Sequence, residues 1–372
     1  DLRCYTGPAE SGPARARERC DETREAGGRC GGADKTVALG IPPSPAPPLS
    51  TVQGSLLRIV LLSAQILFLE MLLIRWIGTE VRVFAYLQNG VLVAAFLGLG
   101  LGARQSREPV RLFPATLALA LLALFVRDPF RWDLGEALTL GLTAFQDSMV
   151  WSTGNWHDLT QAVRSAFVAF AVGATMAMLW AIVVVFRPRG QWLGRWLDEG
   201  ARPIPAYSAN ILGSLLGILL FAGLTGLRTP PWLWLAAATP GLVLLAPLGR
   251  DARPARVAAV ALALLVPAIV FPSKGDGTVH TGWSPNQKLA LQPWVSPLAG
   301  GSVLACGQEI MVNGAFHQGL VDLDPARQAA APARFPPAEI PTSHYLLPYR
   351  LIPRPGRVLV AGAGTGNDVA SA

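Results

Sequence analysis

The stretch "VQGSLLRIVLLSAQILFLEMLLIRWI", residues 52–77, is an apolar run interrupted by only a few charged side chains. A helix needs about 17 to 25 predominantly apolar residues to cross a bilayer, and this run meets that length. Similar runs recur along the chain at residues 84–103, 110–126, 164–186, 206–227 and 231–248, with a shorter one at 257–271. The sequence therefore predicts a membrane domain of six or seven helices over residues 51–272.

The composition agrees with this class. Hydrophobic residues make up 51% of the 372 residues and charged residues 15%, and the mean hydropathy is +0.39. In a soluble protein, a net charge of +7 would suggest binding to nucleic acid. Outside the apolar runs, however, the sequence has no segment in which basic and aromatic residues alternate, as they do in nucleic-acid-binding proteins. We therefore expect the lipid bilayer, and no nucleic acid, as a partner.

Arginines gather in three loops between the predicted spans, and such loops usually face the cytoplasm. We expect an integral protein of the bacterial inner (plasma) membrane with its soluble part in the cytoplasm. If residues 257–271 cross the membrane fully, however, everything after them lies on the outside, and the sequence leaves this open. The arginines of the three loops are Arg104, Arg107 and Arg111; Arg187, Arg189, Arg195 and Arg202; and Arg250, Arg253 and Arg256.

Two further segments have a distinct composition. Residues 1–50 are rich in Arg, Gly and Pro, which predicts a disordered leader. Residues 134–151 carry Glu136, Gln146 and Asp147 among apolar residues, which predicts a helix lying at the membrane interface. The four cysteines match neither a zinc pattern nor a disulfide framework.

Polar and small residues inside the predicted spans have two interpretations. Glu70 is either a functional carboxylate or a packing residue paired with a neighbouring helix. Ala209, Gly213 and Gly217 recur every fourth residue, which predicts a close helix contact, with Asn210 beside it as a hydrogen-bonding group.

The alternating glycines of "FLGLGLG", residues 96–102, do not keep one helical face. They predict a loosened helix end before the first arginine loop.

The character of the chain changes after residue 272. "QKLAL" alternates as a strand does, and Asn313-Gly314 between two apolar-bearing runs predicts a hairpin turn. "SHYLLPYRLI" predicts a short helix or turn, and the single histidines His317 and His344 are interpreted as surface or packing residues. Residues 273–353 thus predict a small β-rich subdomain, and "VLVA" at 358–361 predicts a buried parallel strand that starts a Rossmann-like domain over 354–372.

The glycines that follow this strand, Gly362, Gly364 and Gly366, predict a backbone turn that lets a nucleotide or adenosyl group approach closely. The dinucleotide fingerprint G-x-G-x-x-G lacks its last glycine here. The spacing fits better the first motif of S-adenosylmethionine-type transferases, with Thr365 and Asp368 as further cofactor-binding candidates.

Four segments resemble the aminopropyltransferase (spermidine synthase) family, in the same order along the chain. They are "WSPNQKLAL" with Gln287, "IMVNGAFHQ" with Gln318, "HYLLPYRL" with Tyr345, and "VLVAGAGTGND". With its membrane segment, the chain resembles the membrane-fused spermidine synthase-like proteins. The resemblance implies transfer of an aminopropyl group from decarboxylated S-adenosylmethionine to a polyamine, without a metal. It implies cofactor contacts from the glycine turn and Gln287, with Gln318 and Tyr345 toward the substrate.

The resemblance leaves several alternatives open. Thr365 stands where the family has a carboxylate that contacts the donor's amine, so methyl transfer from ordinary S-adenosylmethionine is a rival. The family's catalytic Asp is expected beyond Ala372, so the chain is expected to be an inactive fragment alone. A second rival is a membrane transporter or sensor that uses Glu70 and Asn210. A second copy of the chain, forming a homodimer, is a further candidate partner.

Overall fold

The computed structural model describes residues 49–145, 159–199, 203–271, 279–297, 303–320, 324–330, 343–353, 355–362 and 364–371. The chain divides into two units, Asp1–Pro48 and Leu49–Ala372. The predicted leader falls almost entirely in the first unit, which lies outside the described residues, as do Gln146, Asp147 and Arg202.

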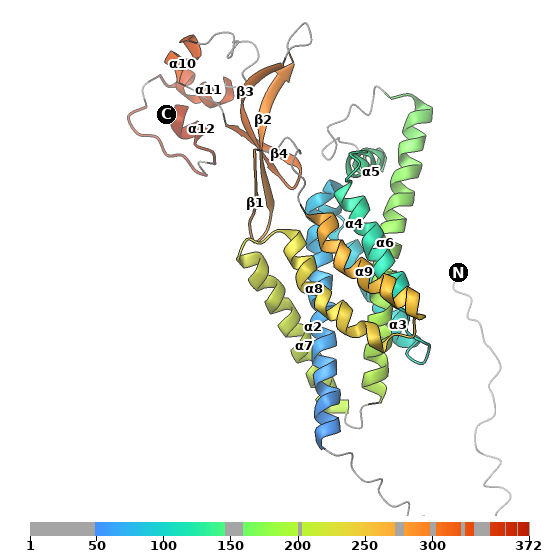
Figure 1. The fold of residues 1–372 in the computed structure, drawn as a ribbon. Coiled ribbons are helices and arrows are strands. Elements are labelled where there is room, and N and C mark those ends of the chain that lie inside the picture. Colours follow the sequence, from blue (N-terminus) through green and yellow to red (C-terminus); the bar gives the residue numbers. More distant parts are fainter. Residues whose placement is uncertain are drawn as a thin grey trace, which may run out of the picture. The chain divides into compact units, whose positions relative to one another are not determined.

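The membrane part of the second unit is a bundle of helices (Figure 1). Five helices of the described chain are long and apolar enough to cross a membrane, namely α2 from Gly54, α6, α7, α8 with the turn that follows it, and α9. The predicted spans at 84–103 and 110–126 form α3 and α4, which have only 17 and 15 residues. At 1.5 Å per residue α4 is about 22 Å long, less than the bilayer core of about 30 Å. The helices are α2 (Leu49–Glu80), α3 (Gln88–Arg104), α4 (Phe113–Arg127), α5 (Leu134–Leu142), α6 (Gln161–Asp198), α7 (Pro203–Gly226), α8 (Pro231–Leu245) and α9 (Arg253–Val270), with short 3-10 turns η2 (Arg82–Ala85), η3 (Thr143–Phe145) and η5 (Ala246–Leu248).

The arginine-rich segments meet at one end of the bundle. Arg195 near the end of α6 donates to the carbonyl oxygens of Ser106 and Glu108 between α3 and α4. Before α9, the backbone nitrogen of Arg250 donates to the carbonyl oxygen of Val110 at 2.8 Å. The Asp251 carboxylate accepts from the backbone nitrogens at the start of α4, where the first turn of a helix lacks internal partners. The three segments therefore share one side, as the sequence predicts.

The second of these segments is not a loop, however. Helix α6 continues for 38 residues to Asp198, so Arg187, Arg189 and Arg195 lie within it. At about 57 Å it is longer than the membrane core. The polar end of α6 is stabilised by packing against α3, because Gly190 lies directly against the backbone of Leu99. The amino-acid composition of this end alone does not predict a helix that continues so far.

Glycines form two close helix seams. In α7, Gly213 and Gly217 lie against the backbone of Val60 and Ala64 in α2, which confirms the predicted contact. Asn210 also meets α2 as expected, because its Oδ1 accepts from Ser63 Oγ at 2.7 Å.

The second seam corrects the prediction of a loosened helix end at residues 96–102. Gly98 and Gly102 lie against α6, at the carbonyl oxygens of Val183 and Arg187, whereas Gly100 has open space around it. Within the alternating glycines, two that are four residues apart share one helical face and let the backbones approach.

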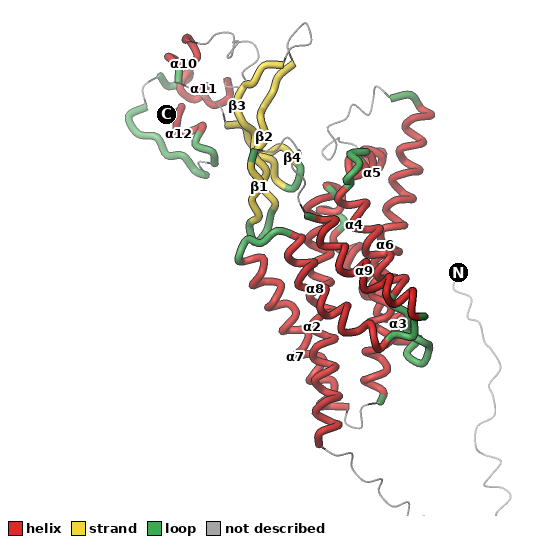
Figure 2. The backbone as a smooth tube through the Cα atoms, viewed as in Figure 1, coloured by secondary structure: helices red, strands yellow, loops and turns green. Residues whose placement is uncertain are grey.

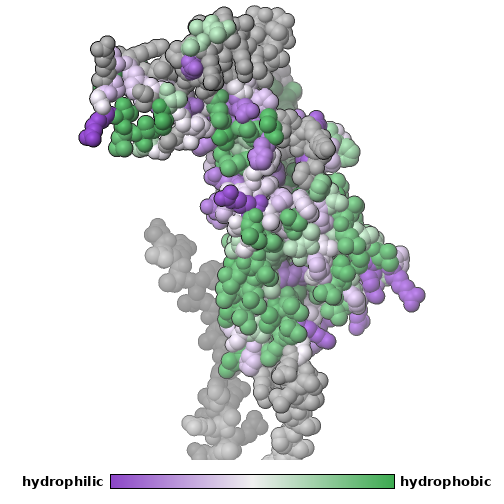
Figure 3. Space-filling view, turned by 60° about the vertical axis from the view of Figure 1, so that its left-hand side comes forward, coloured by the Kyte–Doolittle hydropathy of each residue, from purple (hydrophilic) through white to green (hydrophobic). Residues whose placement is uncertain are grey.

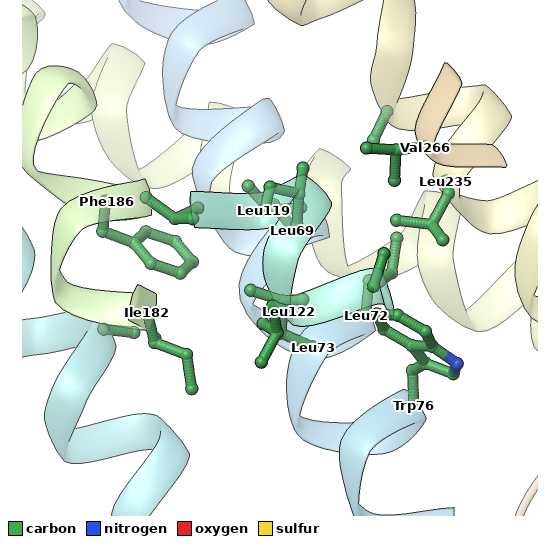
Figure 4. Packing of buried hydrophobic residues seen from close by; sticks show 14 of the residues in the cluster. Leu69, Leu72, Leu73, Trp76, Leu119, Leu122, Ile182, Phe186, Leu235 and Val266 are labelled. Atoms are coloured by element: carbon green, nitrogen blue, oxygen red, sulfur yellow. The ribbon is translucent and has the colours of Figure 1, made fainter. Parts of the chain in front are cut away.

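Helix α2 runs through the apolar core, which Figure 4 shows from close by. Its buried side chains belong to one hydrophobic cluster with those of α4, α6, α8 and α9. Many other apolar side chains are exposed on the outer faces of the bundle. Figure 3 shows these as a broad apolar surface, as a bilayer-embedded protein requires. Core residues include Leu69, Leu72, Leu73, Trp76, Leu119, Leu122, Ile182, Phe186, Leu235 and Val266.

The predicted interface helix is α5, a shorter helix than expected within the described residues. It packs on α6 rather than standing alone, since Gly141 lies against the backbone of Phe167 and Leu138 is fully buried. Residues 146–158 lie outside the described residues.

The C-terminal part contains a four-stranded antiparallel meander in the order β1-β2-β3-β4 (Figure 2). The predicted hairpin is confirmed at Asn313 and Gly314, which have φ angles of 51° and 77°. Positive φ at both central residues is the geometry that Asn-Gly favours in a two-residue turn. The elements are β1 (His280–Trp283), β2 (Lys288–Pro297), β3 (Val303–Val312), β4 (Ala315–Leu320), α10 (Pro325–Ala330), α11 (Ser343–Leu351) and α12 (Asn367–Ser371).

The strand predicted at residues 358–361 is not formed. These residues form neither helix nor strand, and Leu359 is 95% exposed. A parallel strand of this apolar kind is stable only between neighbouring strands and under covering helices. The described part of the chain thus has a helical bundle and a small antiparallel sheet, without a parallel sheet.

Candidate functional site

The glycine turn after residue 361 has the backbone conformation for which glycine is needed. Gly362, Gly364 and Gly366 have φ angles of 72°, 54° and 88°, a region that side-chain-bearing residues rarely adopt. Helix α12 begins directly after it at Asn367. The turn is therefore the tight, glycine-dependent bend that the sequence predicts, although no strand leads into it.

Gln318 of β4 is in contact with this turn. Its Oε1 accepts from the backbone nitrogen of Thr365 at 3.2 Å. A β carbon on Gly364 would lie 2.5 Å from the same oxygen, so the Gln318 amide would have to move, and the positive φ is the stronger reason for glycine here. The structure thus brings together two groups that the sequence analysis proposed separately, the cofactor turn and the substrate glutamine.

Asn367 anchors the other side of the turn. It is 3% exposed, and its Nδ2 donates to the carbonyl oxygen of Gly319 in β4 at 2.6 Å. The sequence instead predicts a cofactor contact from the neighbouring Asp368, which is half-buried in the first turn of α12. A buried amide that bridges to a strand has no signature in a single sequence, so this residue was missed.

A bulge in the β3–β4 hairpin positions Gln318. Met311 pairs with Phe316, but Ile310 pairs with Gln318, so His317 is an extra residue on β4. An extra residue of this kind turns the side chains that follow it. His317 itself is exposed, in agreement with its interpretation as a surface residue.

The remaining site candidates are Gln287, in the β1–β2 turn, and Tyr345, in α11. Gln287 is exposed in the β1–β2 turn, where its backbone nitrogen and oxygen bond to Ser284. Since β1 and β4 are opposite edges of the sheet, Gln287 is not part of the glycine turn's surroundings. Tyr345 is half-buried in α11, and α11 contacts α12.

The link between bundle and sheet was not predicted from the sequence. At the end of α2, Glu80 pairs with Lys288 of β2 at 2.6 Å, and Arg75 donates to the carbonyl oxygen of Ser284 at 2.6 Å. Arg82 of η2 donates to the carbonyl oxygen of Gly314. All three contacts lie at the end of the bundle opposite the arginine-rich segments, because α2 runs from one end to the other.

A cavity of about 690 Å³ lies beside these contacts. Cationic and aromatic side chains line it together, among them Arg127, Arg228, Trp232, Trp283 and Lys288. Trp283 also stands edge-on to the buried Trp234 of α8, with ring centroids 5.4 Å apart. Figure 3 shows hydrophilic side chains next to the apolar surface of the bundle.

Polar groups also lie deep in the bundle. Glu70 is 3% exposed, and its Oε2 has no hydrogen-bond partner within the described residues. Both amide atoms of Gln65 are likewise unpartnered there, and this side chain fills the space beside Gly241 of α8. An unpartnered polar group in hydrocarbon is costly, which makes Glu70 a functional candidate.

No group of three or more His, Cys, Asp or Glu side chains that could hold a metal ion occurs among the described residues. No protein-family model, curated protein or solved structure matches the chain.

Proposed function

We propose that the chain is part of a membrane-embedded transferase similar to the spermidine synthase-like proteins. Its glycine turn at 362–366 and the β3–β4 hairpin contribute one wall of a site for S-adenosylmethionine or its decarboxylated form. The observation that carries the proposal is the contact of Gln318 with the turn, because two motifs of the resemblance meet in space although 47 residues separate Gln318 from Thr365.

The chemistry that this site would serve is a displacement at a carbon next to a sulfonium. Such a reaction depends on holding the nucleophile in line with the leaving group, so positioning is the protein's main contribution. Nothing lies within 4 Å of the place that a β carbon on Gly362 would take, which leaves room for the adenosyl group at the backbone. Gln318 holds the turn's Thr365 nitrogen in place and thereby its shape.

The identity of Thr365 bears on which group is transferred. Its hydroxyl is buried and has no hydrogen-bond partner within the described residues. A neutral hydroxyl does not pair with the amine of the decarboxylated donor as a carboxylate would. This favours methyl transfer from ordinary S-adenosylmethionine as the alternative to aminopropyl transfer to a polyamine.

The test is cofactor binding by the purified protein. Equilibrium dialysis with each labelled cofactor in detergent measures the affinity. Gly364→Ala is expected to weaken binding at least about tenfold, because alanine is strained at φ +54° and its β carbon collides with Gln318. Gly356→Ala is the matched control, since its β carbon meets nothing within 4 Å.

Binding of neither cofactor, or equal loss in both variants, refutes the proposal. Mass spectrometry of the products after incubation with putrescine then distinguishes the aminopropyl from the methyl reaction.

A second candidate is a transporter or sensor, which the buried and unpartnered Glu70 favours. Two results together would support this candidate instead. The wild-type protein would bind neither cofactor, and the Glu70→Gln variant would lose the transport or sensing of a ligand that the wild type shows.

A further inference from the structure

The loop that follows α4, residues 128–133, begins where several candidate membrane spans end. Arg127, the last residue of α4, lines the same cavity as Glu80, Pro231 and Val270. Glu80 ends α2, Val270 ends α9 and Pro231 begins α8, and all three helices are candidate spans. Where spans end, the hydrocarbon of a bilayer gives way to the headgroup layer. The loop is therefore at headgroup depth.

Two aromatic side chains of this loop are exposed together. Phe130 is 66% exposed and Trp132 is 67% exposed. Their rings stack on each other, with centroids 5.1 Å apart and an interplanar angle of 25°. The two rings thus form one continuous apolar surface, in contrast to the single exposed apolar side chains that any protein surface carries.

The backbone of the loop is fixed in an uncommon conformation. Asp128, Arg131 and Asp133 have φ angles of 44°, 58° and 53°, a region that residues other than glycine rarely adopt. The Asp128 carboxylate accepts from the backbone nitrogens of Trp132 at 3.1 Å and of Leu134 at 3.0 Å. Such a conformation costs free energy and persists where other contacts determine it. The two rings are therefore presented by a preformed loop.

The length of α4 indicates what the rings contact. The 15 residues of α4 extend over about 22 Å, which is less than the bilayer core of about 30 Å. A helix that is too short for the bilayer is held at its depth by its neighbours and by interfacial side chains at its ends. Tryptophan is the typical side chain for this layer, because its ring is apolar and its N–H is polar.

We propose that residues 128–133 form an interfacial anchor, in which Phe130 and Trp132 lie in the headgroup layer of the bilayer on the side where α4 ends. The partner is the lipid surface itself. The Asp128 carboxylate positions the two rings through its hydrogen bonds to the loop backbone. The inference is independent of the proposed transferase activity.

The test measures what surrounds position 130 in the full chain, reconstituted into phosphatidylcholine vesicles. The four cysteines are replaced by serine, and Phe130→Cys is labelled with the fluorophore bimane. Three quenchers are compared: a lipid with its quencher near the headgroup, a lipid with its quencher at the chain end, and iodide in the water on both sides of the membrane. Leu359→Cys, labelled in the same way, is the control, because Leu359 is 95% exposed outside the bundle.

We expect the headgroup-level quencher to act on position 130 at least about twofold more strongly than the chain-end quencher, and iodide to act at least about twofold less than on the control. Asp128→Ala removes both acceptor oxygens and is expected to raise iodide quenching at position 130. Asp128→Asn keeps one acceptor and tolerates a positive φ, so we expect a smaller rise. Circular dichroism of both variants checks that the helices remain.

Four results would overturn the proposal. Iodide quenching equal to that of the control would place the loop in water. Protection from all three quenchers would show that protein covers the rings, and strongest quenching from the chain end would place them in the hydrocarbon. Unchanged quenching in a folded Asp128→Ala variant would show that this carboxylate does not position the rings.

Discussion

Replacing Gly217 by alanine tests whether the α2–α7 seam holds the bundle together. A β carbon at this position would lie 3.0 Å from both the carbonyl carbon and Cα of Ala64, and closer still to its carbonyl oxygen, whereas ordinary contacts are 3.4–4 Å. Helix backbones on both sides form the obstacle, so no flexible side chain can move aside. Overpacking of this kind costs about 1–3 kcal/mol, and we expect the free energy of unfolding to fall by that amount.

Gly223→Ala in the same helix provides the matched control. Its β carbon meets nothing within 4 Å. Alanine is the better helix former by about 0.5–1 kcal/mol, so this variant is expected to be as stable as the wild type or slightly more stable. The two variants carry the same chemical change and differ only in what lies beside them.

The assay is reversible unfolding in mixed micelles with increasing dodecyl sulfate, followed by circular dichroism. The α3–α6 seam allows a repeat with Gly102→Ala and its control Gly100→Ala, which again has open space. If Gly217→Ala unfolds at the same detergent fraction as Gly223→Ala, the close backbone contact does not exist and the reasoning fails.

Two further predictions follow from the fold. Gly314→Ala should lower the free energy of unfolding by about 1 kcal/mol, because Gly314 has φ 77° in the hairpin turn, and Gly282→Ala, at an ordinary φ, should not; equal thermal shifts of the two variants would contradict this. The proposed transferase needs its sheet on the cytoplasmic side, although the sheet lies opposite the arginine-rich end; a fluorescent protein fused after the C-terminal residue is expected to fluoresce, and an active alkaline phosphatase fusion there would refute the transferase proposal.

Much of the membrane part could be predicted from sequence because its signals are local. Runs of apolar residues identify the spans, and the four-residue recurrence of Gly213 and Gly217 identifies one seam. Gly98 and Gly102 have the same four-residue spacing. Gly100 between them makes the glycines alternate, and this alternation suggests a loosened helix end instead of a seam. The length of α6 was underestimated because its polar end is stabilised by α3, which hydropathy does not register.

In the C-terminal part, the sequence predicts the β-rich subdomain and its hairpin correctly, but not the absence of the last strand. Asn313-Gly314 encodes its own positive φ angles, so the hairpin follows from two residues. The parallel strand at 358–361 needs neighbouring strands, and a local apolar pattern does not supply them. The pairing of Lys288 with Glu80 joins residues 208 positions apart, a distance at which no spacing rule operates.

The three contacts that tie α2 and η2 to the sheet also have a mechanical meaning. Arg75, Lys288 and Arg82 engage the β1–β2 turn, the start of β2 and the β3–β4 turn, which all lie at one end of the meander, so a force on the sheet acts on these contacts together. The helix that carries two of these contacts is the one that runs through the core, and its Glu70 lies five residues before Arg75 and ten before Glu80, about one and a half to three turns away. Because α2 also runs through the core, it connects the strands directly to the interior of the bundle.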